Sequence, residues 1–399
     1  MHSDINLTSL TADVTKSAYL EKMLEKTTSS YKFYWLMGII DEVCAGNTRI
    51  DYSRIVAQMA ANAWYPTNFF HLSLGLSDQL DSLTRYAMKT YKLGINAKKA
   101  EVLRVIEDNL ETDKQLRTSM TSFIKYVPLR LVRPFYEAEV KQGQQDLKDS
   151  GINRPDAYAD KLILHANTSE PEKAFYRVIP NENALEVSSE WAKFVRNNTQ
   201  VIHGWLDFRL TQYLQTRNPS VPAISMKLRP QEQRNLASAK SYWRCAFGLT
   251  ALADIYSGKR FTADNFEIMG ALSIDHFIPW SFVLHDEAWD LIPMFKNANS
   301  SKSDSLPAIE RYLQPFCNQQ FDAMIAIKEA GLQGKHKEQF ESLRAVDSHI
   351  DEYSNSDSSR DAFSKALGNT LVPLYQIALN QGYQVVRYMG DTSYFVINT

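Results

Sequence analysis

One segment, residues 273–307, constrains this chain more than any other part of its sequence. It reads SIDHFIPWSFVLHDEAWDLIPMFKNANSSKSDSLP, with an adjacent Asp275-His276 pair near its start and Asn299-x-x-Lys302 near its end. Carboxylate and amide oxygens suit Mg²⁺, which keeps several waters and needs few protein ligands. An imidazole that titrates near neutrality can take a proton from water. The segment therefore predicts a site that combines a divalent cation with an activated water.

The order of these residues resembles the HNH endonucleases, whose ββα-metal fold sets a β-hairpin against one helix with the cation between them. In that family the first strand ends in Asp-His, the second carries a central Asn, and the helix begins with Asn or His followed three residues later by Lys. Residues 274–279, 289–293 and 299–302 match these three parts. The spacing is similar to that of the HNH domain in CRISPR effector nucleases. The resemblance covers about residues 240–310 and implies hydrolysis of DNA phosphodiester bonds.

The resemblance implies a role for each polar residue of the segment. His276 would be the general base, and Asp275 and Asn299 would bind Mg²⁺ or Mn²⁺. Strand alternation points the His276 and Asp275 side chains to opposite faces, which suits this division. Asp290 stands where the family has its central Asn, and an ionised Asp can accept but cannot donate a hydrogen bond. Either the loop is held in another way, or Asp290 supports the cation electrostatically.

Three further points concern ligands near this segment. Many relatives carry zinc-binding cysteines just before the helix, whereas this chain has Phe295 and Ala298, so we expect no structural zinc. His285 is a candidate to contact metal or substrate, with an exposed loop residue as the alternative. Lys302 is a candidate to bind substrate phosphate near a helix N-terminus, with a plain surface lysine as the alternative.

A basic stretch precedes the segment. Between Arg209 and Arg260 the chain has nine Lys and Arg residues against two acidic ones, although its formal net charge is -2. A polyanion site must therefore be a local patch. We expect Arg244, Lys259 and Arg260 to bind substrate together with Lys302, and a solvated helix face is the alternative.

Hydrophobic periodicity predicts a mainly α-helical fold, with a helical N-terminal region, the HNH module and C-terminal helices. Helices are predicted over 17–43, 52–64, 77–93, 96–109 and 113–127, loops over 143–172, and a β-hairpin from residues 173–179 and 184–188. The predicted domains are 1–142 (helical), 143–228 (hairpin and helices), 229–335 (HNH nuclease) and 336–399 (helical tail).

Composition and layout bear on location and partners. The sequence has no apolar run of about 18 residues and no signal-peptide pattern, so we expect a cytoplasmic protein without membrane contact, acting on DNA. By analogy, such a layout resembles bacterial restriction or phage-defence effectors. It leaves open a homodimer, which would cut both strands, or a partner subunit of a defence system. The alternatives are a catalytically inactive HNH-fold scaffold that binds nucleic acid or a partner, and an RNA-cleaving nuclease.

Overall fold

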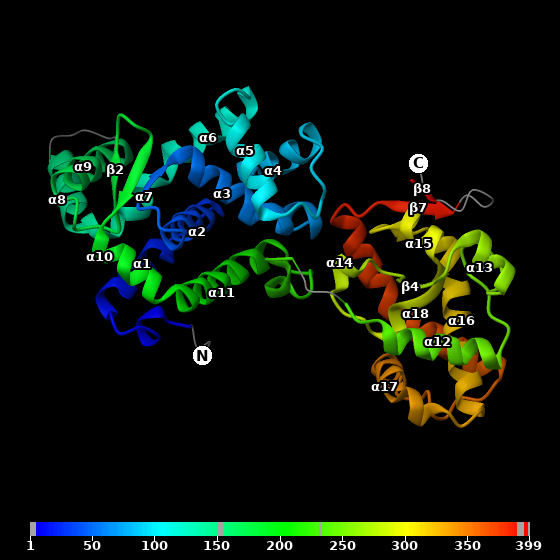
Figure 1. The fold of residues 1–399 in the computed structure, drawn as a ribbon. Coiled ribbons are helices and arrows are strands. Elements are labelled where there is room, and N and C mark those ends of the chain that lie inside the picture. The colour runs from blue at the N-terminus through cyan, green and yellow to red at the C-terminus, as the bar shows by residue number, and fades with distance from the viewer. Residues whose placement is uncertain (1–4, 150–154, 231–233, 389–394, 398–399) are drawn as a thin grey trace. The chain divides into compact units, whose positions relative to one another are not determined.

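The computed structural model describes residues 5–149, 155–230, 234–388 and 395–397 (Figure 1). The described chain is mainly α-helical, as predicted. Its contacts divide it into two units, Met1–Pro219 with Ile224–Pro230, and Ser220–Ala223 with Gln231–Thr399. This division falls near the predicted joint at residues 228–229, and the finer four-part division stays a prediction. Each unit is described by itself below.

The first unit is a set of helices with one small antiparallel sheet, in the order β1-β3-β2. Its helices are α1 (Val14–Glu25), α2 (Tyr31–Cys44), α3 (Tyr52–Trp64), α4 (Gln79–Thr90), α5 (Lys99–Asn109), α6 (Lys114–Tyr126), α7 (Pro128–Val132), α8 (Glu137–Asp149), α9 (Pro155–Ser169), α10 (Ser189–Asn197) and α11 (Thr199–Arg217). Short turns of helix are η1 (Leu7–Ser9), η2 (Tyr65–Phe69), η3 (Arg133–Tyr136) and η4 (Ile224–Lys227), and the strands are β1 (Arg49–Asp51), β2 (Tyr176–Ile179) and β3 (Ala184–Val187).

Two central helices form the core of the first unit. α2 and α3 pack on each other, and most of their residues are buried. Such all-round burial is typical of helices enclosed by others. α10 and α11 pack on α2, and α5 packs on α3. The predicted hairpin is confirmed as β2 and β3, which pair antiparallel.

The prediction of loops over residues 143–172 is wrong, because α8 and α9 occupy most of that stretch. The predicted loop stretch begins at Gly143, but this residue lies inside α8, where a Cβ atom would overlap Leu162 Cδ1 of α9. Its lack of a side chain lets the two helices approach closely. Val140 and Ile163 are buried on these helices and supply the apolar packing.

The second unit surrounds a short antiparallel hairpin, β4 (Leu272–His276) and β5 (Leu291–Phe295), with helices (Figure 1). Its helices are α12 (Ala237–Leu249), α13 (Ala263–Met269), α14 (Trp280–Val283), α15 (Lys296–Lys302), α16 (Ile309–Glu329), α17 (Lys337–Val346) and α18 (Asp357–Asn380), with short turns η5 (Ala288–Asp290) and η6 (Gln333–His336). A further sheet joins β6 (Leu306–Pro307), β7 (Val385–Tyr388) and β8 (Phe395–Ile397).

One apolar core unites the second unit. It includes Phe277 of the loop after β4, Phe316 and Phe321 of α16, and Phe363 of α18. The Phe277 and Phe316 rings lie 4.6 Å apart between centroids, and α12 packs on both hairpin strands and on α16. The hairpin is therefore held by helices that come before and after it in sequence. Among the described helices, none has the length and apolar composition that crossing a bilayer requires.

Candidate functional site

The β4–β5 hairpin holds the Asp275-His276 pair at the end of its first strand. Asp275 lies opposite Ile292 and His276 opposite Leu291. Every residue of β5 is buried, and a slip by one position would turn its side chains to the other face. Burial of β5 therefore fixes the register that positions the pair.

α15 covers the face of β4 that carries Asp275. Alternation along the strand points Ser273 and Asp275 to the same face. Asn299 Nδ2 donates to Ser273 Oγ at 2.5 Å, and Lys302 Nζ lies 2.9 Å from Asp275 Oδ2. Asn299 and Lys302 share one side of the helix because they are three positions apart. The carboxylate of Asp275 and the carboxamide of Asn299 therefore belong to the same strand–helix interface.

Lys302 lies inside the module, with 1% of its surface exposed. Besides its ion pair with Asp275, its ammonium donates to the His276 carbonyl oxygen at 3.0 Å. The sequence predicts either phosphate contact or a surface position for this lysine, but the structure surrounds its ammonium with protein oxygens. The geometry supports a positioning role, because the ammonium ties the carboxylate of Asp275 to the backbone of His276.

The His276 ring lies between two oxygen acceptors at one nitrogen and an arginine at the other. Nε2 is 2.9 Å from the His285 carbonyl oxygen and 3.0 Å from Asp286 Oδ1. Both partners accept, so the hydrogen of the neutral ring belongs on Nε2. Nδ1 then keeps a lone pair, which accepts from Arg234 Nη1 at 3.4 Å. The ring is thereby oriented, and Nδ1 is the nitrogen that can act as a base when this long contact is released.

Asp286 and Arg234 complete the surroundings of this imidazole. Burial would raise the pKa of Asp286, but its hydrogen bond with His276 and the nearby Arg234 guanidinium hold that pKa below its ordinary value. The Arg234 guanidinium lies 4.6 Å from the centre of the Trp280 ring, and 38% of its side chain is exposed. Stacking on an indole limits the motion of a cation beside the imidazole.

Asp290 holds the loop between the two strands. Its Oδ1 accepts from the Ile278 backbone N–H at 2.8 Å, and its carbonyl oxygen accepts from Phe277 N–H at 2.8 Å. Burial raises the pKa of Asp290 well above its ordinary value, and its Oδ2 has no hydrogen-bond partner among the described residues. A protonated carboxyl has one acceptor and one donor, as a carboxamide does. Asp290 can therefore replace the family's central Asn in holding the loop.

The oxygens of Asp275 and Asn299 fit a hard divalent cation. Asp275 Oδ2 has an ion pair with Lys302 and no further partner among the described residues. The Asn299 amide nitrogen is engaged by Ser273, so its carboxamide oxygen is the ligand that remains. No group of three or more His, Cys, Asp and Glu side chains suited to a metal occurs in the described part of the chain. A cation here would draw its other ligands from water and phosphate, as Mg²⁺ commonly does.

His285 contributes through its backbone more than through its ring. Its carbonyl oxygen contacts His276, while its Nδ1 accepts from the Glu287 N–H at 3.4 Å. Its ring packs 4.9 Å from Trp289, and burial lowers the pKa of the imidazole. These contacts favour a structural role for the ring. Contact of His285 with metal or substrate stays a prediction.

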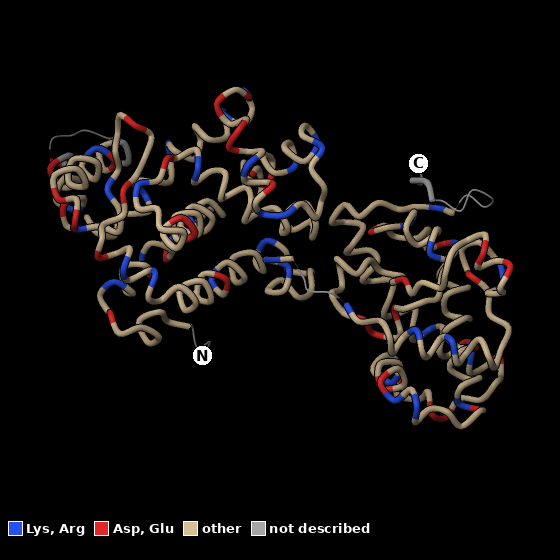
Figure 2. Tube along the Cα trace, in the orientation of Figure 1, with Lys and Arg blue, Asp and Glu red and all other residues tan. Residues whose placement is uncertain are grey.

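The basic stretch divides between the two units. Arg209, Arg217, Lys227 and Arg229 belong to the first unit, and Lys227 is buried. In the second unit three of the predicted substrate-binding residues, Arg244, Lys259 and Arg260, are exposed, whereas the fourth, Lys302, is buried. Figure 2 shows Lys and Arg interspersed with Asp and Glu along the trace of each unit. A role of the three exposed residues in binding nucleic acid stays a prediction.

Three residues of the site were not predicted from sequence. Asp286, Arg234 and Ser273 contact His276 or Asn299, yet none of them belongs to the motif that identified the segment. The sequence carries one usable signal, since Ser273 is two positions before Asp275 and must share its face. Arg234 belongs to the basic stretch between Arg209 and Arg260, but its contact with His276 follows only from the fold.

Comparison with known proteins agrees with this geometry. Residues 254–308 match the family model described as HNH endonuclease. The matched segment contains the hairpin, α15 and every residue of the predicted cation site. The chain thus carries an HNH endonuclease module, which indicates nuclease activity. Neither the curated proteins nor the solved structures gave a match.

Proposed function

We propose that the HNH module hydrolyses DNA phosphodiester bonds with His276 as general base. The observation that carries this proposal is the state of the imidazole, whose Nε2 is held by Asp286 and the His285 carbonyl while the Nδ1 lone pair faces Arg234 Nη1 at 3.4 Å. A base of this kind must be oriented before it can accept the proton of an attacking water. Asp286 supplies the orientation and stabilises the imidazolium that forms.

The remaining residues position charge around this base. Mg²⁺ or Mn²⁺ held by Asp275 and Asn299 would offset negative charge on the scissile phosphate. Lys302 holds the Asp275 carboxylate, and Asp290 holds the loop that follows β4. Arg234 lies beside Nδ1 with part of its side chain exposed, so we assign it to the phosphate next to the attacked bond.

An inactive scaffold is the main alternative, and Asp290 in place of Asn is the feature that favours it. The contacts of Asp290 weaken that alternative, because its Oδ1 and its carbonyl oxygen hold the loop through the Ile278 and Phe277 N–H groups. Cleavage of RNA is a second alternative, distinguished by replacing the plasmid with an RNA substrate. A restriction or phage-defence role, a cytoplasmic location, and a homodimer or partner subunit stay predictions.

Nicking of supercoiled plasmid tests the proposal directly. The purified chain is incubated with Mg²⁺, with Mn²⁺ or with EDTA, beside the His276→Ala variant. We expect metal-dependent nicking that falls by about 10²–10⁴-fold in the variant, the usual range for loss of a general base. His349→Ala is the matched control, because His349 is exposed and its recorded ion pair is with Glu352. Equal residual nicking by all three proteins would point to contamination and to a site without catalysis.

A further inference from the structure

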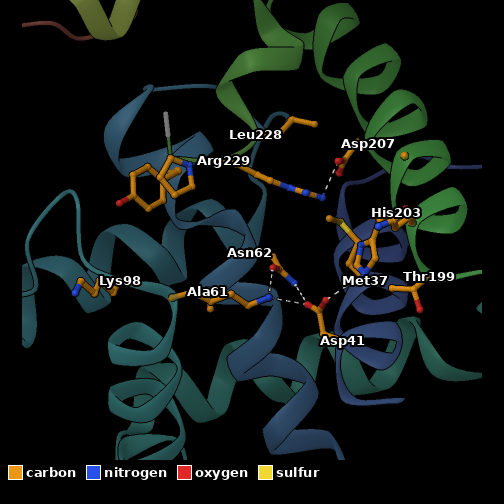
Figure 3. Close-up of a pocket in the computed structure, with 15 residues that line it drawn as sticks. Met37, Asp41, Ala61, Asn62, Lys98, Thr199, His203, Asp207, Leu228 and Arg229 are labelled. Carbon is orange, nitrogen blue, oxygen red and sulfur yellow. Dashed lines mark hydrogen bonds and ion pairs between the residues drawn. The ribbon is translucent and has the colours of Figure 1, made fainter. Parts of the chain in front are cut away.

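The first unit contains a pocket that is separate from the nuclease module. Its volume is about 870 Å³, within the range of about 300–1,000 Å³ typical of small-molecule sites. Side chains from α2, α3 and α11 line it, together with Leu228, Arg229 and Pro230 (Figure 3). All of these elements belong to the first unit. The pocket therefore does not depend on how the two units are arranged.

A network of polar side chains forms one side of the pocket. Lys99 Nζ lies 2.8 Å from Asp41 Oδ2 and donates to Asn62 Oδ1 at 2.7 Å. Asn62 Nδ2 in turn donates to Asp41 Oδ2 at 2.8 Å. Figure 3 shows Asn62 and Asp41 facing each other within this network. These groups satisfy one another and form a pre-organised polar wall.

Helix α11 forms an adjoining wall with His203 and Asp207, which lie four positions apart and so share one face. Arg229 Nη2 pairs with Asp207 Oδ2 at 2.6 Å, and His203 Nε2 lies 3.7 Å from Asp41 Oδ1 (Figure 3). The other two polar atoms, His203 Nδ1 and Asp207 Oδ1, are buried without a hydrogen-bond partner among the described residues. Leaving such atoms unpaired costs about 1–3 kcal/mol each.

Both unpaired atoms are acceptors. Burial lowers the pKa of His203, so its ring is neutral, and the nearby Asp41 carboxylate favours the hydrogen on Nε2. Asp207 accepts through a carboxylate oxygen. The two side chains are 22% and 27% exposed, and both line the pocket. A ligand that satisfies them must bring N–H donors.

The rest of the lining is apolar and cationic. Met37, Ala61 and Leu228 supply apolar surface beside the aromatic ring of Tyr65, which suits a flat ring system. Three cationic side chains line the pocket, and two of them, Lys99 and Arg229, are paired with Asp41 and Asp207, so Lys98 supplies the net positive charge. The lining thus combines acceptors for N–H groups, a surface for a ring and a positive rim for an anion.

We propose that this pocket binds a nucleotide whose base carries an exocyclic amino group. The amino group would donate to Asp207 and His203, the base would lie on the apolar surface beside Tyr65, and the phosphate would meet the cationic rim. Adenine, guanine and cytosine have the required N–H donors. Uracil offers a single ring N–H beside two carbonyl acceptors, so it matches the wall less well.

Isothermal titration calorimetry of the full chain tests the proposal, with AMP, GMP, CMP and UMP and with their nucleosides as probes. We expect at least one amino-bearing monophosphate to bind with a Kd below about 1 mM. UMP and the phosphate-free nucleosides should bind at least about tenfold more weakly, a loss that corresponds to one hydrogen bond or ion pair. Absence of binding by all four monophosphates would overturn the proposal, and so would equal affinity for nucleosides and monophosphates.

Variants of α11 localise any binding to the pocket. Gly204 lines the pocket, and a Cβ added there would meet no heavy atom within 4 Å. Gly204→Leu should therefore fold normally and obstruct the ligand, reducing affinity by about tenfold or more. Gly248→Leu is the matched control, because Gly248 also lies in a helix and also has open space around it. Asp207→Asn should weaken binding to a similar extent, and unchanged affinity in both pocket variants would refute the site.

Discussion

The Asp286→Asn substitution tests how much the orientation of the His276 ring contributes to catalysis, because it leaves His276 itself in place. The substitution keeps an oxygen acceptor for Nε2 but removes its charge. A hydrogen bond to a charged group contributes about 1.5–3 kcal/mol and a neutral one about 0.5–1.5 kcal/mol, so about 1–1.5 kcal/mol is lost. That loss corresponds to about tenfold in kcat. The Asp286 side chain is 30% exposed, and the His285 carbonyl oxygen is a second acceptor for Nε2. We therefore expect the loss to lie at the lower end of the range of about 1–1.5 kcal/mol.

The assay follows plasmid nicking at saturating Mg²⁺ and separates kcat from KM. We expect kcat to fall while KM and the melting temperature stay unchanged, because Asp286 contacts the base and not the substrate. Glu287→Gln is the control, since it removes an exposed carboxylate from the same loop without a recorded contact to His276. If the two variants lose the same activity, Asp286 does not orient the base and the reasoning is wrong.

Three further changes test other parts of the site. Lys302→Met should destabilise the second unit by about 3–5 kcal/mol in urea unfolding, because it leaves Asp275 buried without its counter-charge; Lys296→Met, at an exposed position, should have little effect. The raised pKa of Asp290 makes folding take up a proton, so stability should decline as pH rises above the ordinary value of 3.8. Asp290→Asn should flatten that decline, and an unchanged slope would place its cause elsewhere. Arg234→Gln should raise KM by about tenfold and lower the salt dependence of binding by about one phosphate contact; an unchanged KM would remove Arg234 from the substrate site.

The sequence predicted well where the signal is local. α3 begins and ends at the predicted residues 52 and 64, because its apolar positions recur with helical period and are buried. The β2–β3 hairpin was likewise predicted from two short apolar runs separated by a turn. The order of Asp275, His276, Asn299 and Lys302 was enough to predict the HNH module, which the family model matches.

The parts that were missed depend on contacts between distant residues. The position of Lys302 follows from the reach of its side chain to the hairpin, and the position of Arg234 follows from the fold around Trp280. β6 pairs in parallel with β7, a strand that lies far away in sequence, so no local pattern predicts it. Loops were predicted over residues 143–172 because the stretch contains Gly, Asn, Pro and Asp, and a glycine such as Gly143 serves equally in a turn and in a close contact between helices.

The contacts that hold the β4–β5 hairpin determine the shortest fragment of this chain that can keep the HNH module folded. Gln320 Nε2 donates to the carbonyl oxygens of Ala288 and Leu291 at 2.9 and 2.8 Å, and Ser342 Oγ accepts from the Ala288 N–H at 2.8 Å. These bonds come from α16 and α17, beyond the matched residues 254–308. A fragment cut at the edges of the match would lose the supports of its own second strand. A fragment of this chain that is intended to fold as a nuclease module on its own must therefore extend through α16, α17 and the core residues of α18.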